Sequence, residues 1–274
     1  MKLGLDGKVA LVTGGSSGMG LAIALELAAE GAHVAIGARD PDRLMAAHSA
    51  IAAVARGKIS ATSVDIADAG ATRRWIDDIV DEFGALHIVV ISGGSPPFGT
   101  ASHFELADYR AAVAQILDPA VSLTLDALPH LRAAGWGRVL FVASETAIVP
   151  IRPLALSGVA RAALVRFAQG IAADVGRDGI TVNVLAPGGV HTPLVERLVT
   201  RLAAGGDYDE YLAAMGKHNA LGRVATPQEI AAVAVFLASE RASFVTGAVH
   251  MLDGGASLMG YDQPHLHTEP ERHP

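Results

Sequence analysis

A glycine-rich segment near the start of the chain has the residue types that bind a diphosphate. Thr13-Gly14-Gly15-Ser16-Ser17-Gly18-Met19-Gly20 follows an apolar run at 9–12 and precedes helix-forming residues at 21–29. A strand, a glycine turn and a helix in this order leave unpaired helix N–H groups and the positive dipole end beside the turn. The Gly-Lys-Ser/Thr of a triphosphate-binding loop is missing. The segment therefore predicts a dinucleotide site, and a tight turn without a ligand is the alternative.

A second candidate position is Gly37-Ala38-Arg39-Asp40, at the end of the next apolar run. In dinucleotide-binding folds this point faces the adenosine ribose, where an acid binds a free 2′-hydroxyl and an arginine binds a 2′-phosphate. Arg39 directly follows the strand end, and a guanidinium pairs well with phosphate oxygens. The sequence therefore favours NADP(H) over NAD(H), with an ordinary solvated arginine as the alternative. Asp40 is more simply interpreted as a helix N-cap.

The Thr-Gly-x-x-x-Gly-x-Gly spacing resembles the fingerprint of the short-chain dehydrogenase/reductase family. Pro187-Gly188-Gly189-Val190-His191-Thr192 resembles the family's Pro-Gly-x-x-x-Thr, and the likeness runs from about residue 5 to about residue 256. Ile91-Ser92-Gly93-Gly94 stands at the family's Asn-Asn-Ala-Gly, with the small residues kept and the asparagines missing. The chain is thus similar to 3-oxoacyl-ACP reductase-like proteins, as an atypical member.

The resemblance implies where each part of the cofactor binds. The backbone of Val190 and the hydroxyl of Thr192 would hold the nicotinamide carboxamide, and Asp65 with Ile66 would contact the adenine; a turn-forming aspartate is the alternative for Asp65. The implied cofactor-binding residues are Thr13, Gly14, Ser16, Ser17, Gly18, Met19, Gly20, Arg39, Asp65, Ile66, Ser92, Gly93, Gly94, Arg161, Pro187, Gly188, Val190 and Thr192.

The residues expected to carry the chemistry depart from the family pattern. The family uses Asn, Ser, Tyr and Lys, with Tyr-x-x-x-Lys beginning thirteen residues after the serine. Ser144 matches that serine, but Ser157 stands in the place of the tyrosine and Arg161 in the place of the lysine. The asparagine position falls at Ile116, or at Gln115 if the helix shifts by one residue.

These replacements change what the site can do. A serine hydroxyl is a far weaker acid than a tyrosine, so it drives proton transfer poorly near neutral pH. Arg161 lies one helical turn after Ser157 and could bind the nicotinamide ribose, but it stays charged and cannot shuttle a proton. Ser144 and Ser157 can still hydrogen-bond a carbonyl.

Several nearby groups could replace the missing proton donor, and for each a surface or packing role is the alternative. Glu145 follows Ser144 directly and is the strongest of them, which makes Ser144, Ser157, Arg161 and Glu145 the predicted catalytic residues. Histidine titrates near neutrality. The weaker candidates are His103, Arg152, His191, Tyr208 and Tyr211.

Strand-like and helix-like segments alternate along the chain and must position these residues. We expect strands at 9–12, 33–38, 58–64, 87–91, 138–143, 180–185 and 248–252. After the helix at 21–29, we expect helices at 41–55, 69–83, 106–132, 156–175 and 228–238. Pro119 and Pro129 are expected to interrupt the helix at 106–132. This alternation predicts an α/β protein, a Rossmann-type doubly wound parallel sheet of about seven strands with helices on both faces. Residues 1–260 would be one domain with a substrate loop at about 190–222, followed by a tail at 261–274 whose histidines lack metal-ligand spacing.

Composition excludes several other classes. The 274 residues are 51% apolar and 18% charged, enough for a full core, and the net charge of −7 argues against nucleic acid or an anionic membrane as the main partner. There is no cysteine, which excludes disulfides and thiolate chemistry. We find no uninterrupted apolar run of membrane-spanning length and no signal-peptide pattern, so a cytoplasmic location is expected.

The sequence therefore predicts an NADP(H)-dependent oxidoreductase that acts on a small carbonyl or alcohol. The alternatives are an NADP(H)-binding protein without redox turnover, such as a sensor or partner subunit, and a lyase or isomerase on the same scaffold. The resemblance also implies a homodimer or homotetramer formed through the helices at 106–132 and 156–175. Interface candidates are Leu123, Leu164, Val165 and Phe167, with a place in the chain's own core as the alternative.

Overall fold

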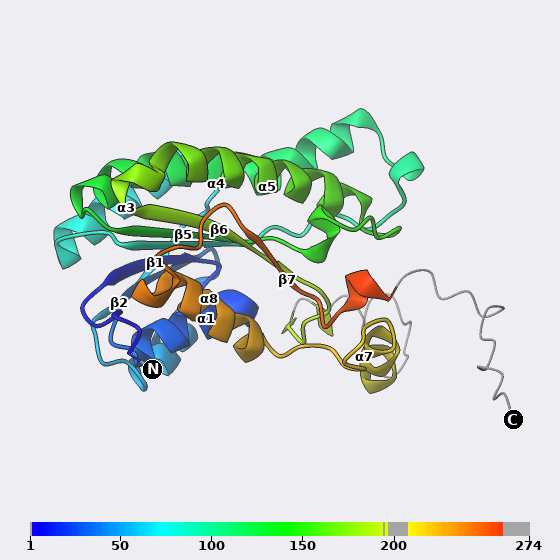
Figure 1. Ribbon diagram of the computed structural model, residues 1–274, viewed down its shortest axis with the longest axis horizontal. Helices are drawn as coiled ribbons and strands as arrows, with labels where there is room; N and C mark the ends of the chain where they lie inside the picture. The colour runs from blue at the N-terminus through cyan, green and yellow to red at the C-terminus, as the bar shows by residue number, and fades with distance from the viewer. Residues whose placement is uncertain (1, 194, 197–207, 260–274) are drawn as a thin grey trace, which may run out of the picture.

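Seven parallel strands form the centre of the protein, in the order β3-β2-β1-β4-β5-β6-β7 (Figure 1). The computed structural model describes residues 2–193, 195–196 and 208–259. The strands are β1 (Val9–Thr13), β2 (His33–Ala38), β3 (Ile59–Ser63), β4 (Ile88–Ser92), β5 (Gly137–Val142), β6 (Ile180–Pro187) and β7 (Val249–Leu252). The predicted fold class, a doubly wound parallel sheet of the Rossmann type, is confirmed.

Helices cover both faces of this sheet (Figure 1). One face carries α1 (Gly18–Ala29), α2 (Pro41–Ala52) and α8 (Pro227–Ala238), and the other carries α3 (Ala69–Phe83), α4 (Leu106–Ala133) and α5 (Ala155–Val175). The shorter α7 (Tyr208–Gly216) lies beyond the carboxyl end of β7 (Figure 1). The central strands β1 and β4 are covered on both sides, and their apolar residues therefore run continuously, whereas the edge strand β3 is half-buried and alternates apolar with polar residues.

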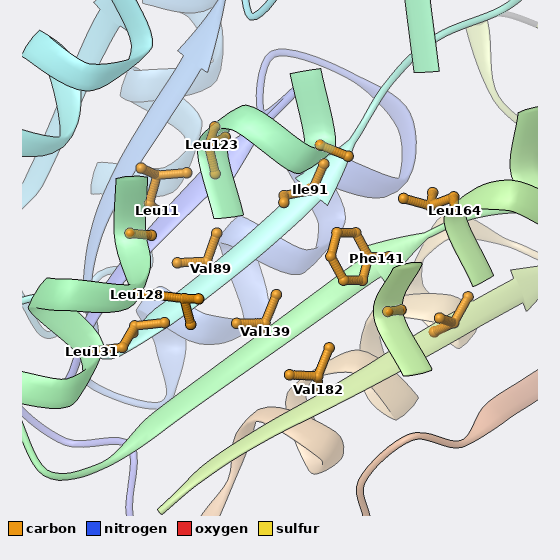
Figure 2. Close-up of a cluster of buried hydrophobic side chains, with 14 of the residues drawn as sticks. Leu11, Val89, Ile91, Leu123, Leu128, Leu131, Val139, Phe141, Leu164 and Val182 are labelled. Atoms are coloured by element: carbon orange, nitrogen blue, oxygen red, sulfur yellow. The ribbon is translucent and has the colours of Figure 1, made fainter. Parts of the chain in front are cut away.

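The hydrophobic core on the α4 and α5 side of the sheet consists of strand and helix side chains that pack against one another (Figure 2). Val89, Val139 and Phe141 project from β4 and β5, and Leu128 and Leu131 of α4 pack over them. All five are 6% exposed or less. Burying a side chain of this size contributes roughly 1.5–3 kcal/mol, so the packing of α4 depends on many such contacts.

Helix α4 differs from the sequence prediction because its two prolines do not interrupt it. Pro119 and Pro129 both lie inside one continuous helix from Leu106 to Ala133. A proline in a helix interior costs about 3 kcal/mol through the lost hydrogen bond and its ring clash. The helix lies between α3 and α5 on the sheet, and the burial of its long apolar face offsets that local cost.

The proposed interface residues on α4 and α5 lie inside the chain's own core instead. Leu123, Leu164 and Val165 are 4% exposed or less, and Phe167 packs edge-to-face on Phe141 with ring centroids 6.1 Å apart. The intrachain alternative is therefore supported for Leu123, Leu164 and Val165, whereas Phe167 is only partly buried.

By length and hydropathy, α4 is the one helix among the described residues that could cross a bilayer. In its most apolar window, 44% of the residues are buried inside the protein. The core contacts described above account for the apolar character of that buried part.

The sheet order places a topological switch between β1 and β4. The chain proceeds outward to β2 and β3 on one side of β1, and to β5, β6 and β7 on the other. All strands are parallel, so their carboxyl ends emerge at one edge, and ligands of such sheets bind outside that edge at the switch point. The glycine segment after β1 and the Ser92-Gly93-Gly94 turn after β4 therefore lie at the expected ligand position.

Candidate cofactor and catalytic site

The amino end of α1 is open to a bound anion. Ser17 precedes the helix in an extended conformation and its side chain makes no capping hydrogen bond, and no acidic residue occurs in the first turn. Ser16 and Ser17 are partly exposed, and neither side chain has a hydrogen bond among the described residues. A helix end with free N–H groups and no competing carboxylate attracts a phosphate. This end of the site therefore fits a diphosphate.

Two glycines of the segment are required by close approach of the backbone. Gly14 has φ +63°, and a Cβ on it would lie 2.7 Å from the carbonyl oxygen of Ser92. A Cβ on Gly20 would overlap the carbonyl oxygen of Gly14. The turn can therefore close tightly only with glycine at these positions.

Thr13 joins the ends of the two strands that flank the switch point. Its hydroxyl donates to the carbonyl of Ser92 at 2.9 Å and accepts from the Ser92 N–H at 2.8 Å. Thr13 is fully buried, so its hydroxyl supports the site from beneath rather than facing a ligand. Met19 is partly buried and packs against the hydrophobic core on the α1 side of the sheet.

The end of β2 presents an arginine that has no partner. Arg39 is exposed, and its guanidinium makes no ion pair or hydrogen bond with any described residue. The neighbouring Asp40 accepts from the backbone N–H of Arg43 at 3.0 Å and from its Nε at 2.7 Å. These two hydrogen bonds lower the pKa of Asp40. Asp40 is thus confirmed as the N-cap of α2, and Arg39 is the group available to a 2′-phosphate.

The turn after β3 approaches the turn after β4. The Cδ1 of Ile66 lies 3.7 Å from the position that a Cβ on Gly93 would take. Asp65 accepts a hydrogen bond from the N–H of Ala67 at 3.1 Å, which is the turn-forming arrangement. Its carboxylate is exposed and still open to a ligand.

The motif after β6 meets the motif after β1. A Cβ on Gly18 would lie 3.4 Å from the Cγ2 of Thr192, although the two residues are about 170 positions apart in sequence. Gly188 packs so closely on Asp253 that a Cβ there would lie 2.9 Å from the Asp253 Cα. Val190 is buried and forms a bridge with Ala225. The fold therefore brings both predicted cofactor motifs to one place.

Ser157 and Arg161 form a hydrogen-bonded pair at the amino end of α5. The Nη1 of Arg161 donates to the Oγ of Ser157 at 2.7 Å, and its Nη2 donates to the carbonyl of Gly94 at 2.8 Å. Ile116 lies beside Gly94, 2.8 Å from the position of a Cβ there, whereas Gln115 is exposed. Ile116, one of the two positions predicted for the family's asparagine, therefore lies beside the Gly94 turn and offers no polar group there.

Thr146 was not predicted from the sequence, yet it contacts Ser157 directly. Their hydroxyl oxygens lie 3.0 Å apart, and the two residues are 5% and 7% exposed. The N–H of Thr146 also donates to the Oγ of Ser144 at 3.2 Å. Ser-x-Thr at the end of a strand is a spacing typical of a hydroxyl-capped turn, and this signal could have identified Thr146. The three hydroxyl residues therefore form one connected group.

Burial shifts the titration of two charged groups here. Burial lowers the pKa of Arg161 to about 10, so it remains a cation near neutrality. Burial, and then repulsion from Asp253, raise the pKa of Glu145 to about 7. Its Oε2 lies 3.1 Å from the position of a Cβ on Gly188. Glu145 is therefore a carboxyl group that can take up or release a proton near neutral pH.

The weaker candidates for proton transfer make no hydrogen bond or ion pair with this group among the described residues. His191 is exposed, and its ring lies 5.6 Å from that of Tyr208, whose pKa is raised mainly by burial. His103 is exposed and contacts Phe104, and Arg152 is exposed. The side chain of Tyr211 lies outside the described residues, as do residues 260–274. Among the residues described, no cluster of three or more His, Asp or Glu could hold a metal.

A family model described as enoyl-(acyl carrier protein) reductase matches residues 14–257. The chain belongs to the short-chain dehydrogenase/reductase family. D-beta-hydroxybutyrate dehydrogenase from Cupriavidus necator is 33% identical over 259 residues, which cover 92% of this chain and 98% of that protein.

Solved structures of family members have the same architecture. L-sorbose reductase from Gluconobacter frateurii, complexed with NADPH and L-sorbose, superimposes with a TM-score of 0.87 and 33% identity over 93% of this chain and 98% of that one. A 3-oxoacyl (acyl-carrier-protein) reductase from Agrobacterium tumefaciens with NADP bound has a TM-score of 0.81 and 33% identity, over 92% and 95% of the two chains.

The residues at the carboxyl edge of the sheet fit the dinucleotide that these family members carry. The open end of α1 suits a diphosphate, the unpaired Arg39 suits a 2′-phosphate, and the contact between Gly18 and Thr192 joins the two motifs. This fit supports the expectation of NADP(H).

Proposed function

We propose that this chain is an NADP(H)-dependent oxidoreductase that interconverts a carbonyl and an alcohol on a small molecule. The observation that carries the proposal is the proximity of Gly18 and Thr192, because it places the diphosphate loop beside the motif expected at the nicotinamide. A protein that needed only the adenine half of the cofactor would have no use for the second motif. The NADPH in L-sorbose reductase supports the choice of cofactor.

Each end of the cofactor would be held by a different kind of group. The free N–H groups of α1 would bind the diphosphate, and Arg39 would bind the 2′-phosphate. The backbone of Val190 and the hydroxyl of Thr192 would orient the nicotinamide, with the small residues of the Ser92–Gly94 turn leaving room for it. When bound, NADPH supplies a hydride.

The chain's own residues would bind and polarise the carbonyl oxygen. Ser144 and Ser157 carry hydroxyl groups that can donate to it, and Arg161 holds a positive charge 2.7 Å from the Ser157 oxygen. Donors and charges fixed before the reaction stabilise the negative charge that develops on oxygen. Thr146 holds the Ser157 hydroxyl at 3.0 Å and is a positioning residue.

Glu145 would supply the proton that neither serine can provide. Its pKa of about 7 makes it the group in this part of the site whose protonation changes near neutral pH. A general acid works best when its pKa lies near the working pH. Donation by Glu145, directly or through one water molecule, would complete reduction of the carbonyl to the alcohol.

Activity with NADPH tests this proposal. Purified protein is mixed with NADPH and a panel of ketones, ketoesters and quinones, and loss of NADPH absorbance is followed. We expect turnover with at least one carbonyl class, and we expect Glu145→Gln to reduce kcat by about 100-fold while NADPH affinity is kept. Glu82→Gln, on the exposed side of α3, is the matched control. Tight NADPH binding without turnover on any carbonyl would contradict the proposal.

The Ser157–Arg161 pair favours a second candidate, an NADP(H)-binding protein without redox turnover. Here the cation binds a neutral hydroxyl rather than lowering the pKa of a phenol. The double variant Ser157→Tyr with Arg161→Lys would then gain strong reductase activity, whereas an enzyme that already works with serine and arginine would gain little. A lyase or isomerase with Glu145 as its base is the third candidate, and product analysis without added NADPH would reveal it.

We also propose a cytoplasmic homodimer or homotetramer with residues 1–260 as one domain. Leu125 on α4 and Val159 on α5 are 50% and 49% exposed, and they supply apolar surface on the two helices proposed to pair. Light scattering of the purified chain tests the assembly, and a monomer at all concentrations would contradict it.

A further inference from the structure

Arg161 is a largely enclosed cation that has no anionic partner in the part of the chain that the structure describes. Its two hydrogen bonds go to a hydroxyl and to a backbone carbonyl, and it takes part in none of the ion pairs among the described residues. By contrast, Arg43, Arg73 and Arg223 each bind a carboxylate at 2.7 Å or less and lie at the surface. These surface arginines have a counter-charge, and Arg161 has none among the described residues.

Comparison with Arg138 shows that this is not a general feature of buried arginines in the chain. Arg138 is 2% exposed and donates to the carbonyls of Ser239, Gly137 and Gly179. Its guanidinium carbon also lies 4.1 Å from the ring centre of Trp136, and the negative charge of Glu240 raises its pKa against the effect of burial. Arg138 is thus compensated within the chain, as a structural arginine should be.

The donors of Arg161 are only partly used. A guanidinium has five N–H groups, and the two hydrogen bonds occupy one on each terminal nitrogen. Each terminal nitrogen keeps a second N–H, and Nε–H has no partner among the described residues. A guanidinium with donors left on neighbouring nitrogens binds a carboxylate through both oxygens.

Charge decides between the groups that could use these donors. Ribose hydroxyls of the cofactor could accept hydrogen bonds, but they are neutral and would leave the buried charge unpaired. The phosphates would lie at α1 and Arg39, beyond the Gly14–Gly18 turn. Glu145 does not serve either, because it forms no ion pair with Arg161 among the described residues. An unpaired buried charge costs several kcal/mol, so a site that keeps one is suited to an anionic ligand.

Resting on the proposed oxidoreductase function, we propose that the substrate is a keto acid or hydroxy acid, and that Arg161 binds its carboxylate beside the reacting carbonyl held by Ser157. The carboxylate adds the missing negative charge, and the 2.7 Å contact between Arg161 and Ser157 keeps the two recognition groups adjacent. Burial lowers the pKa of Arg161 only to about 10, so the cation is present at neutral pH.

Reduction of a matched acid and ester tests the inference. Benzoylformate and methyl benzoylformate present the same ketone with and without a carboxylate, and kcat/KM with NADPH is measured for each. We expect a preference for the acid of about tenfold to 100-fold, the value of one charged hydrogen-bonded pair. Arg161→Gln should lower both rates, because Arg161 also holds the Ser157 hydroxyl, and it should lower the acid rate more, so that the ratio of acid to ester kcat/KM falls to about one. Arg161→Lys keeps the positive charge but loses the two parallel donors of the guanidinium, so this variant should keep part of the preference for the acid.

Arg166→Gln is the matched control, because Arg166 lies on the same helix, is exposed, and has Gln169 as its one side-chain partner among the described residues. It should leave both rates unchanged. NADPH titration and thermal midpoints of every variant separate loss of recognition from loss of cofactor binding or folding. Equal reduction of acid and ester by the wild type would overturn the inference and leave the oxidoreductase function standing.

A binding measurement decides the inference if neither compound is reduced, an outcome that counts against the proposed function instead. The protein loaded with NADP+ is titrated calorimetrically with benzoate and with benzamide, which have the same shape and differ in charge. Benzoate binding at least about tenfold tighter than benzamide, lost in Arg161→Gln and kept in Arg166→Gln, supports the inference. Equal binding of the two, or binding of neither, overturns it.

Discussion

The two ends of the proposed cofactor site differ in the groups that form them. At the α1 end, backbone N–H groups and close-packed glycines form the site, and few side chains take part. At the α5 end, the site consists of side chains joined by hydrogen bonds, namely Ser157, Arg161 and Thr146. A backbone site depends on the fold, whereas a side-chain site changes with single substitutions. The sequence predicts that the phosphate end follows the family pattern and that the catalytic end departs from it, and this difference in construction is consistent with that prediction.

The largest expected effect concerns the backbone end. Gly14→Val places a branched side chain at φ +63°, with its Cβ 2.7 Å from the Ser92 carbonyl. The turn must open, and we expect NADPH affinity to fall by at least about 100-fold, measured by fluorescence titration. Gly7→Val is the matched control, since Gly7 has φ +72° with no atom within 4 Å. If Gly14→Val bound NADPH as well as Gly7→Val does, the glycine turn would not be the phosphate site.

A smaller effect is expected where the backbone end uses one side chain. Arg39→Ala should weaken NADPH binding by about tenfold to 100-fold, the value of a charged hydrogen bond, and leave NADH binding unchanged. Arg43→Ala removes an arginine that is already paired with Asp40, so it should change neither NADPH binding nor NADH binding. An equal loss of affinity for NADPH and NADH in Arg39→Ala would show that this arginine does not bind the 2′-phosphate.

The side-chain end should make stability depend on pH. The pKa of Glu145 is raised from 4.5 to about 7, so its contribution to stability is complete below about pH 4.5 and is lost as the pH rises through about 7. Glu145→Gln removes this loss. Allowing for solvent screening of a partly exposed group, we expect the variant to be more stable than wild type by about 1–2 kcal/mol at about pH 8. Below about pH 4.5 the two should be equally stable.

Urea unfolding across this pH range measures the difference between the two proteins. Glu82→Gln on the exposed side of α3 should follow the wild type at every pH. A constant difference between Glu145→Gln and wild type at all pH values would mean that Glu145 does not titrate in this window.

The smallest expected effect tests positioning within the side-chain end. Thr146→Val removes the hydroxyl that lies 3.0 Å from the Ser157 oxygen. We expect kcat to fall by about threefold to tenfold, since one neutral hydrogen bond is worth about 1 kcal/mol, with KM unchanged. Thr146→Ser should restore the rate because it restores the hydroxyl. A rise in KM instead, or no rescue by serine, would assign Thr146 to packing alone.

Much of the fold could be predicted because its signals are local. Continuous apolar runs and capping residues predicted every strand and most helix boundaries to within a few residues; Asp40 is one example, as the N-cap of α2. The prolines of α4 misled the prediction, because local propensity contains no information about the core contacts that offset it. Leu123, Leu164 and Val165 were misplaced at an interface for the same reason, since an apolar helix residue has the same appearance in sequence whether it faces a sheet or a partner.

The phosphate end could be anticipated, and the catalytic end only in part. Spacing alone placed Ser157 and Arg161 on one helical turn, but the contact from Arg161 to the Gly94 carbonyl joins residues far apart in sequence. The shifted pKa of Glu145 arises from burial and from Asp253, which lies in another element of the fold. Neither residue type nor spacing expresses how much water a group loses on folding.

The sequence by itself determined the parallel α/β sheet, the glycine turn after β1 and the residue types at the catalytic end, since these follow from periodicity, backbone freedom and side-chain chemistry. Only the tertiary structure decided that Gly18 meets Thr192, that Thr146 holds Ser157, and that Arg161 is enclosed without a counter-charge. These depend on long-range packing, which sets distances and solvent exposure that no local pattern records.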